Sequence, residues 1–155
     1  MDQTENSTSI QQTPESVSPE QERTWAMVAH LSMLINLVTG ILGPVAAFVI
    51  YITYRDRSRY IAFQSLQSLI LQLITWVAAG AIIGIMWAIT GILSAVIVGM
   101  LCIPFAIIIS AILAALPIAG VVYSIIGAIQ CSEGRDFRYW LIGEWIIKSL
   151  MQPRV

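Results

Sequence analysis

Hydrophobic and polar positions divide the chain into three kinds of segment. Residues 1–22 are rich in Gln, Thr, Ser, Pro and Glu, and they include acidic but no basic side chains and no aromatic residue. Residues 23–136 are mostly apolar, and residues 137–151 mix apolar with charged positions. A segment like the first buries too little apolar surface to offset its loss of conformational entropy. We therefore predict a disordered, polar, acidic tail over 1–22.

The central segment is long enough to cross a membrane more than once. Between Arg59 and Glu133 the chain contains no Asp, Glu, Lys, Arg or His, and about 20 such residues suffice for one membrane-spanning helix. Basic residues flank this run on both sides, so both flanks are expected on the cytoplasmic side. An even number of crossings between them is needed, which predicts two spans, 61–89 and 103–130, joined by 90–102.

The first apolar stretch, residues 25–54, is harder to place. As one helix it would be about 45 Å long, against a hydrocarbon core of about 30 Å. It is interrupted by Thr39-Gly40 and Gly43-Pro44, which favour a turn. Two arrangements remain open: one long kinked span, or a broken hairpin with legs 25–38 and 44–54. The glycine and proline cluster favours the hairpin.

A compact basic loop follows this stretch, with arginines at 55, 57 and 59 between tyrosines. Arg55, Arg57 and Arg59 mark a membrane interface and indicate a cytoplasmic loop. Contact with anionic lipid is the alternative role, but lipid-binding clusters usually contain four to eight basic residues. We expect a multi-pass membrane protein, with the 55–59 loop and the C-terminus in the cytoplasm.

The C-terminal segment, residues 137–151, is amphipathic. Wound as a helix, it places Tyr139, Ile142 and Ile146 on one side and Glu144 and Lys148 mostly on the other. About 14 residues are too few to span a bilayer, so an interfacial helix is expected. The predicted fold class is an all-α membrane protein: a bundle of three to four transmembrane or membrane-embedded helices within 23–136, plus this interfacial helix.

Composition supports the membrane class and argues against several others. The chain is 57% hydrophobic and 11% charged, whereas soluble domains contain about 25% charged residues. The net charge of −1 gives no basic surface for nucleic acid. Cys102 and Cys131 form neither a CxxC motif nor a disulfide framework.

No motif indicates catalysis. His30 is the single histidine, so a multi-histidine metal site is excluded. The sequence contains no GxSxG elbow and no phosphate-binding glycine pattern at a helix start. We predict no enzymatic activity, no catalytic residue, no metal and no cofactor.

A row of polar side chains interrupts the first predicted span. Gln64, Ser68 and Gln72 are spaced by four, Thr75 follows three later, and Gln67 lies beside them, so they share one helix face. An unpaired amide is costly in hydrocarbon. The row should therefore either form hydrogen bonds between helices or line a polar path, and His30, with Ser32 and Asn36, is a candidate to meet it.

Small residues recur at helical spacing in the same apolar run. Such rows let membrane helices approach closely, within one molecule or between copies. The three rows are Gly80, Gly84 and Ala88; Gly91, Ala95 and Gly99; and Gly120, Ser124 and Ala128.

Three runs resemble one family of small bacterial membrane proteins, the Tic-twenty-like family, which is grouped with a chloroplast inner-envelope import component. They are Trp25–Ser32 (WAMVAHLS) with Gly43-Pro44 after it, Tyr60–Gln72 (YIAFQSLQSLILQ) and Gly134–Tyr139 (GRDFRY). Gln64 stands where the family pattern has histidine, and Trp140 where it has proline. The resemblance implies a location in the bacterial plasma membrane, a bundle of about four helices and a place in or beside translocation machinery. The positions that it carries over are His30, Gln67 and Gln72, without a catalytic role.

These observations leave two functional hypotheses. The first is a scaffold or accessory component that packs with other membrane proteins or with itself in the lipid bilayer. The alternative is a small oligomeric channel or carrier that uses the Gln64/Ser68/Gln72 face. A conduction path usually contains an ionisable group within the membrane, and none lies between Arg59 and Glu133. The sequence therefore favours the scaffold.

Overall fold

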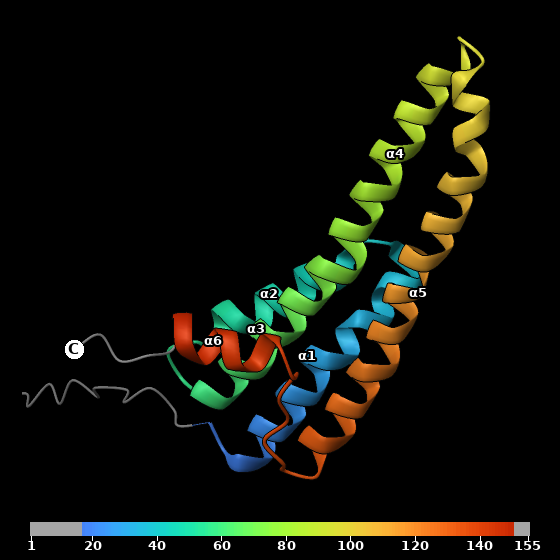
Figure 1. Cartoon of the computed structure of the whole chain (residues 1–155). Coiled ribbons are helices and arrows are strands. Elements are labelled where there is room, and N and C mark those ends of the chain that lie inside the picture. Colours follow the sequence, from blue (N-terminus) through green and yellow to red (C-terminus); the bar gives the residue numbers. More distant parts are fainter. Residues whose placement is uncertain (1–16, 151–155) are drawn as a thin grey trace, which may run out of the picture.

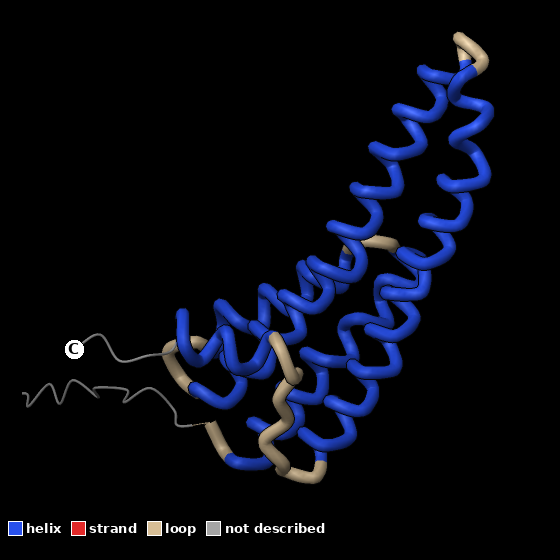
Figure 2. Tube along the Cα trace, in the orientation of Figure 1, coloured by secondary structure: helices blue, strands red, loops and turns tan. Residues whose placement is uncertain are grey.

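The computed structural model describes residues 17–150, and every regular element within them is a helix (Figures 1 and 2). The predicted all-helical fold is confirmed over this range. The elements are α1 (Pro19–Thr39), α2 (Leu42–Tyr54), α3 (Arg59–Gln72), the π-helical segment η1 (Leu73–Ala78), α4 (Ala79–Ser94), α5 (Val98–Ser132) and α6 (Ile142–Leu150).

Helix α1 begins inside the segment that we predicted as a disordered tail. Ser18 caps it: the Ser18 hydroxyl accepts from the Gln21 backbone N–H at 3.2 Å, and the Gln21 side chain accepts from the Ser18 N–H at 3.1 Å. This reciprocal capping box, with Pro19 in the first turn, specifies a helix start. The prediction is therefore wrong for residues 19–22, while 1–16 lie outside the described residues.

Helices α1 and α2 form an antiparallel hairpin. The chain turns at Gly40, whose φ of +78° is a conformation that glycine adopts without strain. The rings of Trp25, near the start of α1, and Tyr54, at the end of α2, lie 5.2 Å apart between centroids. Pro44 falls in the first turn of α2, where its missing N–H would have had no helical partner.

A second, longer hairpin follows. Helix α3, η1 and α4 run without a break over Arg59–Ser94, 36 residues, and α5 returns over 35 residues. At 1.5 Å per residue each rod is about 54 Å long. The connection is residues 95–97 rather than the predicted 90–102, and both helices extend beyond 61–89 and 103–130. The boundary at 103 was wrong because α5 continues through Pro104, which membrane helices tolerate.

The distal half of this second hairpin extends beyond all other elements (Figure 1). Arg59–Ser94 and Val98–Ser132 are the two described helices that are long and apolar enough to cross a membrane, and α2 is a shorter apolar helix. The near half of the hairpin packs on α1 and α2, and the core of the molecule lies there.

The C-terminal segment differs from the predicted helix over 137–151. Residues 137–141 are not helical, and α6 begins at Ile142. Phe137 and Tyr139 point into the core, where they are 5% and 1% exposed. Helix α6 then packs Ile146 against Phe63 of α3. Residues 137–141 leave the helical path because side chains of α3 bind their backbone groups, as described below.

Candidate functional site

The predicted polar row of α3 lies against α1. Together the two helices form what we name the polar seam, made of side chains that are at most 3% exposed: His30, Ser32, Asn36, Gln64, Gln67, Ser68 and Gln72. Thr75 is also buried, but its hydroxyl donates to the Leu71 carbonyl of its own helix at 2.8 Å and does not join the seam.

His30 connects three parts of the chain. The Gln64 amide nitrogen donates to the Phe137 carbonyl at 3.0 Å, so its oxygen faces His30 Nε2, at 3.1 Å. Because an amide oxygen only accepts, Nε2 carries the hydrogen. The ring's Nδ1 then accepts from the Tyr139 hydroxyl, 2.9 Å away. Burial raises the pKa of Tyr139, which keeps this hydroxyl protonated as the donor.

The Gln67 side chain binds the C-terminal segment through both its donor and its acceptor, as a neighbouring β-strand would. Its amide nitrogen donates to the Phe137 carbonyl at 3.1 Å, and its amide oxygen accepts from the Tyr139 N–H at 2.9 Å. One side chain thus satisfies two backbone groups of this segment. A helix beginning at Phe137 would have paired the Phe137 carbonyl internally, but it would have left the Tyr139 N–H in its first turn without a helical partner. A side chain on Gly143 would collide with this arrangement, since a Cβ there would lie 2.8 Å from the Gln67 amide oxygen.

The other half of the seam closes the first hairpin. Gln72 donates to the hydroxyls of Ser32 and Ser68, each at 3.0 Å, and accepts from the Asn36 amide at 3.1 Å. Asn36 in turn accepts from the Gly43 backbone N–H at 2.7 Å. A Cβ at position 43 would lie 2.6 Å from the Asn36 side-chain oxygen, so any larger residue would displace this contact.

Helix α5 covers the seam from the other side. The Ser124 hydroxyl donates to the His30 carbonyl at 2.6 Å. Gly120, Ser124 and Ala128, the small-residue row of α5, are buried, so this row packs within the molecule. Gly80 and Gly84, by contrast, face open space, with no atom within 4 Å of a Cβ built on either.

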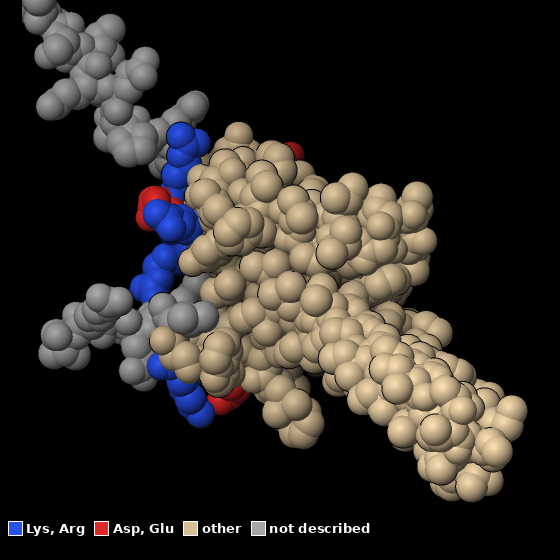
Figure 3. All heavy atoms as spheres, turned by 90° about the horizontal axis from the view of Figure 1, so that it is seen from above, with Lys and Arg blue, Asp and Glu red and all other residues tan. Residues whose placement is uncertain are grey.

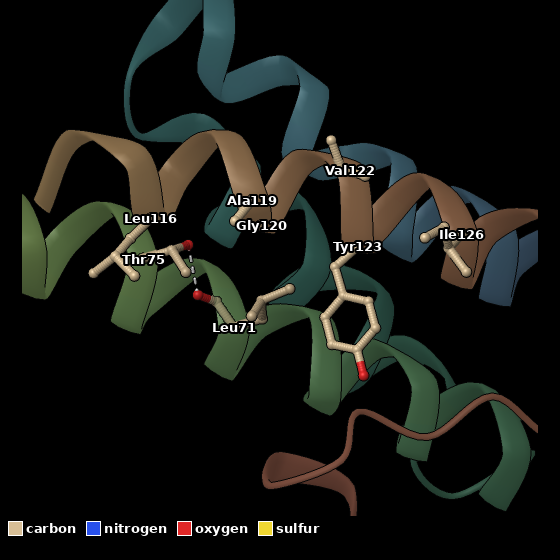
Figure 4. Close-up of a pocket in the computed structure, with 8 residues that line it drawn as sticks. All are labelled: Leu71, Thr75, Leu116, Ala119, Gly120, Val122, Tyr123 and Ile126. Atoms are coloured by element: carbon tan, nitrogen blue, oxygen red, sulfur yellow. Dashed lines mark hydrogen bonds between the residues drawn. The ribbon is translucent and has the colours of Figure 1, made fainter. Parts of the chain in front are cut away.

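An apolar groove of about 480 Å³ runs beside the seam between α3, η1 and α5 (Figure 4). Leu71 and Thr75 form one wall, and Leu116 and Tyr123 belong to the opposite one. With apolar walls on both sides, the groove is suited to hydrocarbon rather than to a polar substrate.

The polar groups of the seam form their hydrogen bonds within the molecule. Among the described residues, the buried side-chain nitrogen or oxygen atoms without a partner are the Ser65 hydroxyl and the Trp76 indole nitrogen. Over residues 17–150 no three His, Cys, Asp or Glu side chains gather as metal ligands would. Amides and hydroxyls that already bind one another can hold helices together, and a pair of them contributes about 0.6 kcal/mol on average in a membrane.

The arginines of the basic loop lie at one end of the molecule. Arg55 pairs with Asp56 at 3.2 Å, Arg57 is exposed, and Arg59 begins α3. Figure 3 shows the Lys and Arg side chains gathered at this end, with none on the visible part of the second hairpin. Ser58 links the loop to α1, since its hydroxyl donates to the Glu22 carboxylate at 2.5 Å.

Residues 21–146 match the family described as the magnetosome magnetite crystal formation protein family, MamF/MmsF. The chain belongs to the MamF/MmsF family. No curated protein and no solved structure matches it. The match covers α1 through most of α6, so the polar seam and the basic loop are both parts of a MamF/MmsF chain.

This membership corrects the expected relationship. The Tic-twenty-like resemblance was wrong, and with it the expected place beside translocation machinery, because the match over 21–146 is to the MamF/MmsF family instead. The quoted runs misled because they are short and set in apolar sequence, where similar patterns arise often. The MamF/MmsF family is one of magnetosome membrane proteins involved in magnetite crystal formation.

Two residues of the site were missed from the sequence. Tyr139 was placed on the apolar face of a predicted helix, and Phe137 at the start of that helix, yet both contact His30: the rings of His30 and Phe137 meet edge to face at 5.6 Å between centroids. The one signal in the sequence was Gly134, because a glycine after an apolar helix often marks its end. In the structure Gly134 has a φ of +78°.

Proposed function

We propose that this chain is a non-enzymatic scaffold of the magnetosome membrane, which contributes to magnetite crystal formation by packing with other membrane proteins or with further copies of itself. The observation that carries the proposal is that the side chains of the polar seam bind one another. Gln64, Gln67 and Gln72 form their hydrogen bonds with α1 and with the C-terminal segment. A polar path would need such groups free to exchange partners with a solute.

In this proposal α3–α4 and α5 cross the membrane, and the α1–α2 hairpin enters it from the same side as their charged ends. That arrangement gives four embedded helices, counting the continuous α3–α4 as one, with α6 at the interface. The exposed Trp140 and Trp145, 80% and 55% accessible, support an interfacial position for this end. The 55–59 loop and α6 then face the cytoplasm, in agreement with their arginines and lysine.

The packing surface in this proposal is the outward row of α4. Gly80, Gly84 and Ala88 are exposed, and small residues allow the backbone of a second helix to approach. Since the matching row of α5 is already buried against α1, the α4 row is left for a partner.

The alternative, a channel or carrier that uses the Gln64/Ser68/Gln72 face, makes a different prediction. Purified chain in liposomes should pass no ions or small solutes above the rate of empty liposomes if it is a scaffold. A flux that Gln64→Leu and Gln72→Leu abolish would contradict the scaffold and support the path.

The scaffold is tested in a magnetite-forming bacterium that lacks the gene. Wild-type chain should restore magnetite crystal size, measured by electron microscopy, and Gly84→Leu should fail although the variant still reaches the membrane fraction. Ile85→Leu is the matched control, because it introduces the same residue at an exposed neighbouring position without adding bulk. Normal crystals with Gly84→Leu would contradict the role of the α4 row.

A further inference from the structure

A second cavity lies at the charged end, apart from the apolar groove. It adjoins the polar seam, since the Gln64 amide nitrogen donates to the Asp136 carboxylate at 3.4 Å. It has a volume of about 280 Å³ and is formed by the start of α3, the segment after α5, and α6. Its wall combines charged with apolar side chains: Arg59, Tyr60, Phe63, Asp136, Arg138 and Ile147. Arginine beside apolar surface is a combination suited to a ligand with a charged head and an apolar body.

The cavity has donors to offer an anion. Arg138 contacts the Asp136 carboxylate through Nε and Nη2, at 3.1 and 2.8 Å, and a guanidinium carries five N–H donors, so the Nη1 side is left for a ligand. Arg59 supplies a second guanidinium. Planar guanidinium groups match phosphate oxygens geometrically.

The cavity lies at the boundary between the charged end and the uncharged part of the molecule. Arg59 is the first residue of the span Arg59–Ser94, so the cavity opens where the uncharged part of the molecule begins. The apolar wall residue Phe63 lies one helical turn further into that span. Trp140 and Trp145, on the same C-terminal segment, are exposed and are typical of the membrane–water interface.

We infer that this cavity is a binding site for a singly charged phosphate group, presented by an anionic phospholipid headgroup or as free phosphate. Arg59 and Arg138 bind the phosphate oxygens, while Phe63 and Ile147 contact the first carbons of the lipid. Bound lipid would join α3 to α6 at the interface and so hold the C-terminal segment in register with the bilayer. The inference does not depend on the scaffold function, because it concerns a different surface.

Binding is measured on the full chain in a neutral maltoside detergent, by native mass spectrometry with three probes: short-chain phosphatidylglycerol, short-chain phosphatidylcholine and inorganic phosphate. Phosphatidylglycerol should bind at least about tenfold more tightly than phosphatidylcholine, a difference of about 1.4 kcal/mol. Tighter binding of phosphatidylglycerol than of inorganic phosphate assigns the site to lipid, and equal binding assigns it to free phosphate. Equal binding of both lipids with none of phosphate would overturn the inference.

Variants separate this site from general charge attraction. Arg59→Gln and Arg138→Gln should each weaken phosphatidylglycerol binding about tenfold, while Arg57→Gln, an exposed arginine of the same loop, should leave it unchanged. Arg138→Lys keeps the positive charge but loses the planar guanidinium group, so its affinity for phosphatidylglycerol should lie between those of the wild type and Arg138→Gln. Asp136→Asn should tighten binding, a gain that an unfolded variant cannot produce. An equal loss with Arg57→Gln, or no gain with Asp136→Asn, would overturn the site.

Discussion

The Nδ1 atom of His30 and the hydroxyl of Tyr139 lie 2.9 Å apart, although 109 residues separate them in the chain. This hydrogen bond joins the middle of α1 to the segment after α5, and Gln64 of α3 completes the link on the other side of the ring at 3.1 Å. Because all three side chains are at most 1% exposed, no water competes for these bonds. The contact therefore holds α1 and the segment after α5 against α3.

Removing the Tyr139 hydroxyl should destabilise the protein. Tyr139→Phe leaves His30 Nδ1 buried without a donor, which costs about 1–3 kcal/mol, and the midpoint of thermal unfolding in detergent should fall. Circular dichroism at 222 nm measures it. Tyr123→Phe is the matched control: Tyr123 packs on Tyr139, but its hydroxyl makes a long 3.4 Å exposed contact with the Trp140 N–H. An equal loss in both variants would refute a special role for the His30 contact.

The close packing of the first hairpin at Gly43 can be tested with one methyl group. Gly43→Ala places a Cβ 2.6 Å from the Asn36 side-chain oxygen and should destabilise the protein by about 1–3 kcal/mol. Gly80→Ala adds the same methyl where nothing lies within 4 Å, and there the gain in helix propensity should stabilise slightly, by up to about 1 kcal/mol. Opposite signs in thermal unfolding are expected, and a neutral Gly43→Ala would contradict the packing described.

Loss of Gln67 should release the C-terminal segment. Gln67→Leu leaves the Tyr139 N–H without its partner, so residues 135–141 should detach more often and trypsin should cut after Arg135 or Arg138 about tenfold faster, which corresponds to about 1.4 kcal/mol. The products are identified by mass spectrometry. Gln130→Leu, the same change on the partly exposed Gln130 of α5, should cleave at the wild-type rate. Unchanged cleavage of Gln67→Leu would show that the segment is held by other contacts.

The proposed topology predicts which sites are accessible from the same side. With Cys102 and Cys131 replaced by Ala, single cysteines at positions 21, 57 and 135 should react with a membrane-impermeant thiol reagent only after the cells are opened. A cysteine at position 96, at the tip of the second hairpin, should not share their pattern. Labelling of position 21 in intact cells would place the start of α1 outside and exclude the hairpin topology.

Much of the architecture follows from the sequence alone. The uncharged run between Arg59 and Glu133 predicts two long apolar helices, since a backbone within a membrane must pair its polar groups internally and a helix does so. The cluster from Gly40 to Pro44 predicts the break between α1 and α2. The spacing of Gln64, Ser68 and Gln72 predicts one polar face, because the 3.6-residue period is a local property of the helix.

Only the tertiary structure determines which groups the polar face of α3 contacts. The periodicity of residues 137–151 predicts a helix from Phe137 onward, yet Gln67 captures the Phe137 carbonyl and the Tyr139 N–H and the helix starts at Ile142. The competition depends on a side chain some 70 residues away, which no local pattern contains. The same reason explains why His30 and Tyr139 could not be paired beforehand: the sequence specifies which polar groups need partners, and only the packing of α1, α3 and α5 determines which partners they find.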